Sequence, residues 1–184
     1  MTETTIYCTE GEPLDLSRDY FAAFALPLDC DVDLAELGAR YRQLQQAVHP
    51  DRFLRECDRS QRLAQQQAAY VNEAYSTLKN PLLRAQYLLH LAGQERAQEA
   101  TVSDPVFLMA QIELRERLDE VRQNLAALDD MYDEVVAQKQ RYWEDFAEHW
   151  RKQDWTGAQR AVDRLQFAVK LLHEIEERQA ALED

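Results

Sequence analysis

Helical periodicity runs through nearly all of this chain, and no segment alternates convincingly in the way that a β-strand does. Glycine (4 residues) and proline (5 residues) are both scarce, so few turns are available and long helices are expected. One amphipathic stretch shows the pattern clearly, with apolar residues recurring at i, i+3, i+7, i+10 and i+14: Leu34, Leu37, Tyr41, Leu44 and Val48. The sequence therefore predicts an all-α fold.

Prolines and glycines divide the first half of the chain into short helices. A short apolar segment, 19–26, can take Ser17 or Asp19 as its N-cap and ends at Pro27. The helix at 34–48 stops before Pro50, because a residue that precedes proline is pushed out of the α region. Further helices are expected at 59–79 and 82–91, the second of them ending at Gly93.

A polar segment without periodicity, 94–103, is expected to link this first domain to a second one. Ser103 or Asp104 can cap a helix that has Pro105 in its first turn. Three long helices are expected at 105–123, 128–151 and 154–182. The predicted organisation is a flexible leader at 1–16, a helical domain at 17–93, a linker at 94–103 and a three-helix bundle at 104–184.

The composition limits the classes of partner. The net charge of −13 argues against nucleic acid or an anionic membrane as the main partner, and no apolar run approaches the ~20 residues that span a bilayer. The three cysteines are scattered, which predicts reduced thiols and no metal or cofactor site: Cys8, Cys30 and Cys57. The first residues have no basic and apolar segments of a secretory signal, so a cytoplasmic location is expected.

The tripeptide His49-Pro50-Asp51 lies between two helices that can pair in an antiparallel hairpin. With the stretch 41–53 around it and 71–87 closing the module, the region 17–93 resembles a J-domain, the module that stimulates a DnaK-type chaperone ATPase. Proline stiffens the loop and removes one backbone donor, while the carboxylate and the imidazole can each reach a partner. The resemblance implies that the following residues contact the chaperone: His49, Pro50, Asp51, Tyr41, Arg42, Arg52 and Phe53. Tyr41 and Phe53 can equally be core aromatics, and for Tyr41 the core is favoured.

The stretch from Arg40 to Arg62 is basic in an otherwise acidic chain. Six arginines outnumber the acids Asp51, Glu56 and Asp58. Such an excess can attract an acidic partner surface, or it can be no more than a solvated helix face.

The helix predicted at 105–123 has two apolar faces. Relative to Leu114, the residues Phe107, Ala110, Leu118 and Val121 fall within about 40° and form a core stripe. Leu108, Met109 and Ile112 fall on the opposite side at about 120–220°. That second face is either a binding surface or a face covered by another part of the protein. In the last helix, Phe167 lies about 200° from Leu165, which predicts an outward aromatic ring.

Three blocks of sequence together resemble the HscB family, also called Jac in fungi: 19–21, 79–89 and 107–120. Members of that family are J-type co-chaperones of iron–sulfur cluster assembly. The resemblance implies a surface for the scaffold protein IscU made of Leu108, Met109, Ile112 and Phe167, with polar contacts from Glu113, Glu116 and Glu120. It also implies that the J-domain presents the loaded scaffold to HscA, a dedicated DnaK-type ATPase. Where the family often has glycine before Leu-Pro this chain has Ala25, which predicts a slightly altered turn.

Other classes of function are weaker. No Glu lies three residues before any of the four histidines (His49, His90, His149 and His173), so the signature of carboxylate-bridged diiron bundles is absent. No catalysis by this chain is expected. A general J-type co-chaperone or an adaptor with another client is the main alternative, and a purely structural helical protein would leave the His49–Asp51 motif without a purpose.

Overall fold

The computed structural model describes residues 15–53, 57–94 and 104–183, which form seven α-helices and one 3-10 turn and contain no strand. The prediction of an all-α fold is confirmed. The chain divides into two compact units, 1–88 and 89–184. This division falls inside the last helix of the first unit, five residues before the boundary expected at Gly93. Most of the predicted leader (1–14) and of the predicted linker (95–103) lies outside the described residues.

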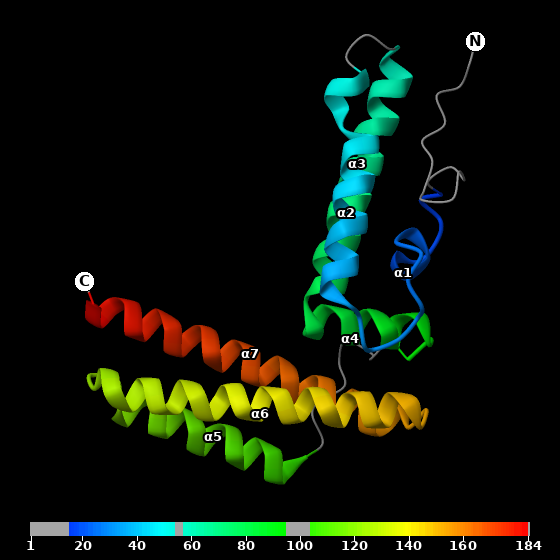
Figure 1. The fold of residues 1–184 in the computed structure, drawn as a ribbon. Coiled ribbons are helices and arrows are strands. Elements are labelled where there is room, and N and C mark those ends of the chain that lie inside the picture. The colour runs from blue at the N-terminus through cyan, green and yellow to red at the C-terminus, as the bar shows by residue number, and fades with distance from the viewer. Residues whose placement is uncertain (1–14, 54–56, 95–103, 184) are drawn as a thin grey trace. The chain divides into compact units, whose positions relative to one another are not determined.

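The first unit is built on an antiparallel hairpin of two helices, α2 (Leu34–Val48) and α3 (Asp58–Lys79), which lie side by side in Figure 1. Asp33 starts α2, because its carboxylate accepts the N–H groups of Ala35 and Glu36 at 2.8 and 3.1 Å. The short 3-10 turn η1 (Pro50–Phe53) follows α2 and packs on α3. Asn80 ends α3, and its side chain then accepts the first N–H groups of α4 (Pro81–Leu91).

The short helix α1 (Tyr20–Ala23) ends in a backbone conformation that does not suit its sequence. Leu26 N–H donates to Phe21 O at 2.8 Å and Ala25 N–H to Ala22 O at 3.0 Å, the two hydrogen bonds of a Schellman motif. That motif needs a left-handed residue, and Ala25 fills the position with φ 49°. The turn after α1 therefore places a Cβ where glycine is the unstrained residue.

Replacing Ala25 with glycine is expected to stabilise the protein by about 0.5–1 kcal/mol, since the relief of left-handed strain exceeds the added freedom of the unfolded chain. Thermal unfolding followed by far-UV circular dichroism measures the change. Gly93, which ends α4 in the same motif with φ 69°, is the matched control. A Cβ there would meet nothing within 4 Å, so Gly93→Ala introduces backbone strain alone and should shift stability in the opposite direction. Equal signs for the two variants would contradict this account.

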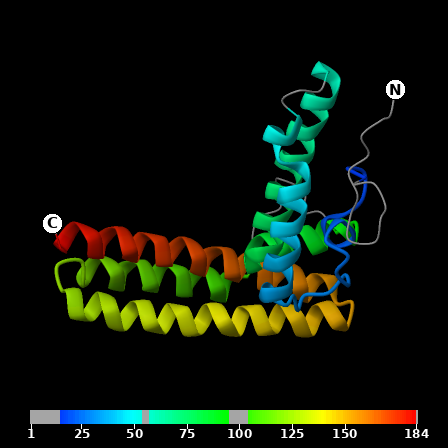
Figure 2. The same ribbon diagram turned by 45° about the horizontal axis from the view of Figure 1, so that its top comes forward.

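The second unit is a bundle of three long helices, α5 (Pro105–Glu120), α6 (Leu125–Arg151) and α7 (Trp155–Glu183), which run alongside one another in Figure 2. All three contribute to one core: Phe107, Leu118, Leu128, Met131, Val135, Phe167, Ala168, Leu171, Leu172 and Ile175. The predicted bundle is thus confirmed. No helix in the described parts of the chain is both long enough and apolar enough to cross a membrane.

Side-chain caps set the ends of these helices. Asp104 accepts Phe107 N–H at 3.1 Å at the start of α5, which agrees with the predicted cap. The helix after α5 was expected to begin at 128, and that position is wrong. Asn124 accepts Ala127 N–H at 3.2 Å, so α6 begins at Leu125. At the other end of α5, Arg178 of α7 donates to Leu118 O at 2.8 Å and satisfies one of the last carbonyl groups.

Candidate interaction sites

The His49-Pro50-Asp51 motif forms an exposed turn at the end of the α2–α3 hairpin (Figure 1). His49 is extended, with φ −60° and ψ 124°, as expected before proline. Asp51 N–H donates to His49 Nδ1 at 3.3 Å, so the ring folds over the turn. The side chains of His49 and Asp51 are 54% and 76% exposed, with Nδ1 and Oδ2 3.7 Å apart. The turn therefore offers one imidazole and one carboxylate to a partner.

The two aromatic residues next to this turn are placed differently from the motif. Tyr41 is half-buried and stacks on Tyr75 with ring centroids 4.0 Å apart. Its hydroxyl donates to Asn72 Oδ1 at 3.0 Å and accepts from Gln45 at 2.7 Å, so Tyr41 packs between the two helices without being fully buried. Its ring holds α2 against α3.

Phe53 is buried, which favours the core alternative over a direct contact with the chaperone. The 3-10 turn coils the chain after Asp51 back onto α3, and this removes the ring from the surface. Phe53 instead anchors the turn that exposes His49 and Asp51. The sequence left this alternative open, because an aromatic residue in a loop carries no periodicity.

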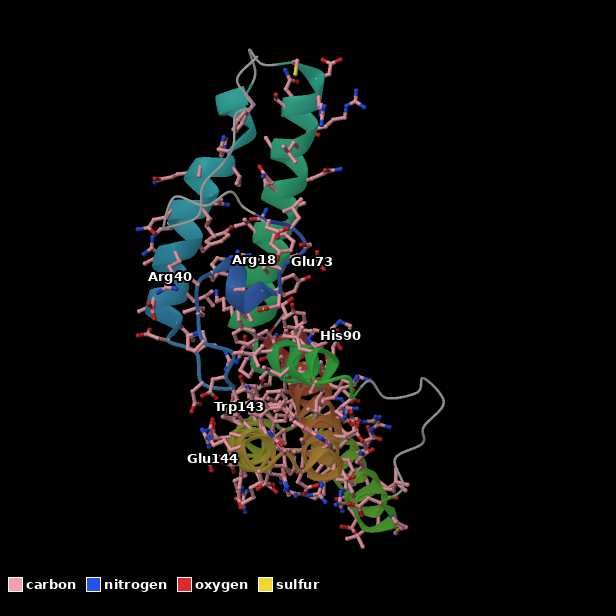
Figure 3. The ribbon with its side chains drawn as sticks, turned by 90° about the vertical axis from the view of Figure 1, so that its right-hand side faces the viewer. Arg18, Arg40, Glu73, His90, Trp143 and Glu144 are labelled. Carbon is pink, nitrogen blue, oxygen red and sulfur yellow. The ribbon has the colours of Figure 1, made fainter. Side chains whose placement is uncertain are left out.

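The basic region beside the turn is smaller than its arginine content suggests. Arg40, labelled in Figure 3, donates from its guanidinium to the carbonyl groups of Phe24 and Ala25, and thereby stabilises the end of α1. Arg42, Arg59 and Arg62 are exposed. The side chains of Pro50 and Arg52, and all of Arg55, lie outside the described residues. Within the described residues, Arg42 is the exposed arginine of α2.

The predicted second face of α5 is exposed. Leu108, Met109 and Ile112 are 40%, 57% and 50% exposed, while Phe107 and Leu118 on the other side of the helix are buried. The helical wheel therefore placed both faces correctly. Val106 is also exposed and belongs to the same face, since it lies three residues before Met109. We call Val106, Leu108, Met109 and Ile112 the α5 patch.

Acidic residues surround the α5 patch. Glu113, Glu116 and Glu120 are exposed, as the sequence predicts. The Asp119 carboxylate forms an ion pair with the guanidinium of Arg178, with N and O atoms 2.8 Å apart. The α5 patch is therefore an apolar surface with carboxylates beside it, which suits a partner that pairs apolar side chains with basic ones.

Phe167 does not point outward, and this expectation is wrong. It is 7% exposed and meets Phe107 of α5 edge to face, with centroids 5.7 Å apart and planes at 87°. The guanidinium of Arg115 lies 5.9 Å from the centre of its ring. The helical wheel failed because α7 is buried on more than one side: both Leu165 and Phe167 are buried. Phe167 therefore supports α5 by packing on Phe107, and it exposes little surface that a partner could contact.

Asp104 ties α5 to α7, which keeps the α5 patch in place. Its carboxylate accepts from Arg164 at 2.9 Å and from Phe107 N–H at 3.1 Å. The hydrogen bond from Arg164, and then that from Phe107, hold the pKa of Asp104 below its usual 3.8. Arg164 also lies over the Phe107 ring, 5.5 Å from its centre.

The lowered pKa of Asp104 predicts a pH-dependent contribution to stability. A group whose pKa is lower in the folded state stabilises fully above its unfolded pKa and loses that effect as the pH falls through the folded value. Asp104→Asn keeps a good N-cap but removes the charge. Wild type should therefore exceed Asp104→Asn in urea midpoint at pH 7 and lose the difference below about pH 3.8. Tryptophan fluorescence measures this, and a difference that stays constant down to pH 2.5 would contradict it.

One group of acidic and thiol side chains comes together in the described residues. Single ligand atoms of Asp29, Cys30 and Asp31 lie within 4.8 Å of one another. Asp29 Oδ1, however, accepts hydrogen bonds from Cys30 N–H at 2.6 Å, from Cys30 Sγ at 3.1 Å and from Asp31 N–H at 3.4 Å. These contacts organise the turn that leads toward α2.

Known proteins are similar to this chain over both of its units. A family model described as the HSCB C-terminal oligomerisation domain matches residues 103–176. A curated co-chaperone protein HscB homolog from Pseudoalteromonas atlantica is 40% identical over 173 residues, covering 90% of this chain and 99% of that protein. The solved structure of chaperone HscB from Vibrio cholerae is similar with a TM-score of 0.83 and 38% identity, over 90% of this chain and 99% of that one. Human co-chaperone HscB gives a TM-score of 0.86 at 27% identity, over 97% and 92% of the two chains.

Proposed function

Because the chain belongs to the HscB family of co-chaperones, we propose that it serves iron–sulfur cluster assembly by bringing an IscU-type scaffold to an HscA-type chaperone. In this proposal the first unit stimulates ATP hydrolysis by the chaperone, and the second unit holds the scaffold. The chain itself carries out no catalysis. The observation that carries the proposal is the exposed pair His49 and Asp51 on a turn that packs on α3, in a chain of this family.

The geometry of the turn supports a role in contacting the chaperone. Asp51 is the most exposed charged group of the described motif, and the 3-10 turn that holds it packs on α3. Little conformational freedom is then lost on binding, because the turn is already formed. A carboxylate that pairs with a cation of the chaperone in a dry interface contributes a strong, directional contact.

The α5 patch supports a role in contacting the scaffold. Four apolar side chains on one side of one helix, flanked by exposed glutamates, form a compact apolar surface with an acidic rim. Binding would bury Leu108, Met109 and Ile112 together, and each side chain contributes in proportion to the apolar area removed from water. Phe167 contributes indirectly, by supporting α5 through Phe107.

The test is steady-state ATP hydrolysis by an HscA-type chaperone, measured with and without an IscU-type scaffold. Asp51→Asn should reduce the stimulation roughly 30-fold or more, as expected for removing one charge of a dry pair. Asp58→Asn, the same change at a nearby exposed residue, is the matched control and should retain the stimulation.

The α5 patch is tested in the same assay with Leu108→Ala/Met109→Ala/Ile112→Ala. This variant should stimulate the chaperone normally without scaffold and lose the additional effect of scaffold, with a half-saturating scaffold concentration raised about ten-fold or more. Leu182→Ala removes an exposed apolar side chain elsewhere in the same unit and should behave as wild type. Unchanged scaffold dependence in the triple variant would favour a general J-type co-chaperone with another client. Failure of wild type to stimulate this ATPase would refute the proposal as a whole.

A further inference from the structure

One polar side chain in the first unit is buried without a hydrogen-bond partner at its acceptor oxygen. Gln67 of α3 is 5% exposed, and its Oε1 accepts no hydrogen bond from the part of the chain that the structure describes. A buried amide oxygen without a donor destabilises a protein, whereas an apolar side chain of similar shape would not. An unpaired buried oxygen calls for an explanation, and a role that appears only when the protein binds a partner is one.

The pairing of α2 and α3 places Gln67 at the end of the hairpin that carries the His49–Asp51 turn. Tyr41 of α2 meets Tyr75 and Asn72 of α3. Because the two helices are antiparallel and rise equally per residue, Gln67 lies level with about residues 46–49 of α2. A helical side chain leans toward the N-terminus of its helix, which for Gln67 is the direction of η1. The turn η1 packs on α3.

The turn would need a new acceptor if a partner drew the His49 ring away. In the free protein Asp51 N–H donates to His49 Nδ1 at 3.3 Å. A partner that draws the His49 ring away removes this acceptor, and the interface excludes the water that could replace it. Pro50 has no N–H, so the donor that would lose its acceptor is Asp51 N–H.

We propose that Gln67 Oε1 is the acceptor for a backbone N–H of the His49–Phe53 turn in the chaperone-bound arrangement. Gln67 is then a positioning residue: it touches no part of the chaperone and holds the turn that does. Its unpaired oxygen lowers the stability of the free protein, and the hydrogen bond is gained only on binding. This inference rests on the proposed function of the first unit.

The test compares two variants of Gln67 for stability and for activity. Gln67→Met keeps the length of the side chain and removes the acceptor, while Gln67→Glu keeps an acceptor and places a carboxyl group in a buried position. Stability is read from amide exchange of peptides that cover α3 in the full chain. Activity is read from the co-chaperone concentration that gives half-maximal stimulation of the HscA-type ATPase. Gln66→Met, the same change at the exposed neighbouring residue, is the control.

The proposal predicts opposite orders for the two measurements. Exchange should be slowest in Gln67→Met, by roughly five-fold relative to wild type, and fastest in Gln67→Glu, where burial penalises the carboxyl group. The half-maximal concentration should rise roughly five-fold in Gln67→Met, equivalent to one net hydrogen bond, and less in Gln67→Glu. If Gln67 had only a structural role, Gln67→Met would not raise the stability of the protein and weaken its stimulation of the ATPase at the same time.

Other results overturn the inference. Unchanged activity in Gln67→Met, or faster exchange in that variant, would show that the oxygen has no such role or is already paired. In either case, stimulation by wild type and its loss in Asp51→Asn would leave the proposed function standing. Absence of stimulation by wild type would instead refute the proposed function, and the inference with it.

Discussion

Phe167→Ala is expected to destabilise the second unit by about 3–4 kcal/mol, a large part of the stability of a unit of this size. Phe167 lies in the shared core of α5, α6 and α7, and its ring meets Phe107 edge to face at 5.7 Å. Alanine would leave a cavity that helices on both sides cannot easily close. It would also remove an aromatic pair that contributes beyond its buried area.

Tryptophan fluorescence in urea measures this loss selectively. The three tryptophans of the chain, Trp143, Trp150 and Trp155, all belong to the second unit, and Trp143 is labelled on α6 in Figure 3. Met109→Ala is the matched control, because Met109 is exposed on the α5 patch and its loss should change stability by less than about 0.5 kcal/mol. A loss below about 1 kcal/mol in Phe167→Ala would mean that its ring is not a core residue.

This prediction changes how the scaffold site should be probed. A Phe167 variant that loses scaffold binding could have lost the helix that carries the α5 patch, because Phe167 supports α5 through Phe107. Variants of Leu108, Met109 and Ile112 avoid this ambiguity, since those side chains are exposed. The scaffold proposal therefore depends on the α5 patch and not on Phe167.

Local chemistry in the sequence accounts for most of the fold. The stop before Pro50, the cap at Asp104 and the turn at Gly93 are all where residue types alone place them. The two faces of α5 also follow from periodicity, because that helix has one buried side and one exposed side. The break before α6 was misplaced because Asn124 was not recognised as a cap.

The errors at the candidate sites have a different physical origin. A helical wheel compares angles around one helix and assumes that a single side is buried, so it cannot show that α7 has neighbours on more than one side, as at Phe167. Phe53 sits in a turn without periodicity, and only the tertiary contact of η1 with α3 decides that it is buried. Gln67 gave no signal at all, because one glutamine among several on a polar helix is distinguished only by the packing around it.

Gly157→Ala is expected to destabilise the second unit by about 2 kcal/mol, although alanine is normally the better helix residue by up to about 1 kcal/mol. Gly157 lies in the first turn of α7, where the end of α6 comes close. A Cβ there would lie 2.5 Å from Asp154 Oδ2 and closer still to His149 Nδ1. These two side chains are themselves 2.8 Å apart.

The collision matters because Asp154 caps α7. Its carboxylate accepts Gly157 N–H at 3.1 Å, and this hydrogen bond, followed by the adjacent His149 ring, lowers the pKa of Asp154. A methyl group at position 157 would push away either the ring that pairs with the cap or the cap itself. Gly157 is therefore present for close approach between helices, since its φ is not in the left-handed region.

A double-mutant cycle separates this collision from an intrinsic effect of alanine in the helix. Removing the ring with His149→Ala leaves space into which the Asp154 carboxylate can turn, so Gly157→Ala in that background should be nearly neutral or stabilising. Urea unfolding followed by tryptophan fluorescence gives the four free energies of unfolding, and a coupling of at least about 1 kcal/mol is expected for groups in direct contact. If Gly157→Ala destabilises equally in both backgrounds, the His149 ring is not what requires glycine. The junction of α6 and α7 would then depend on the space around Asp154 alone.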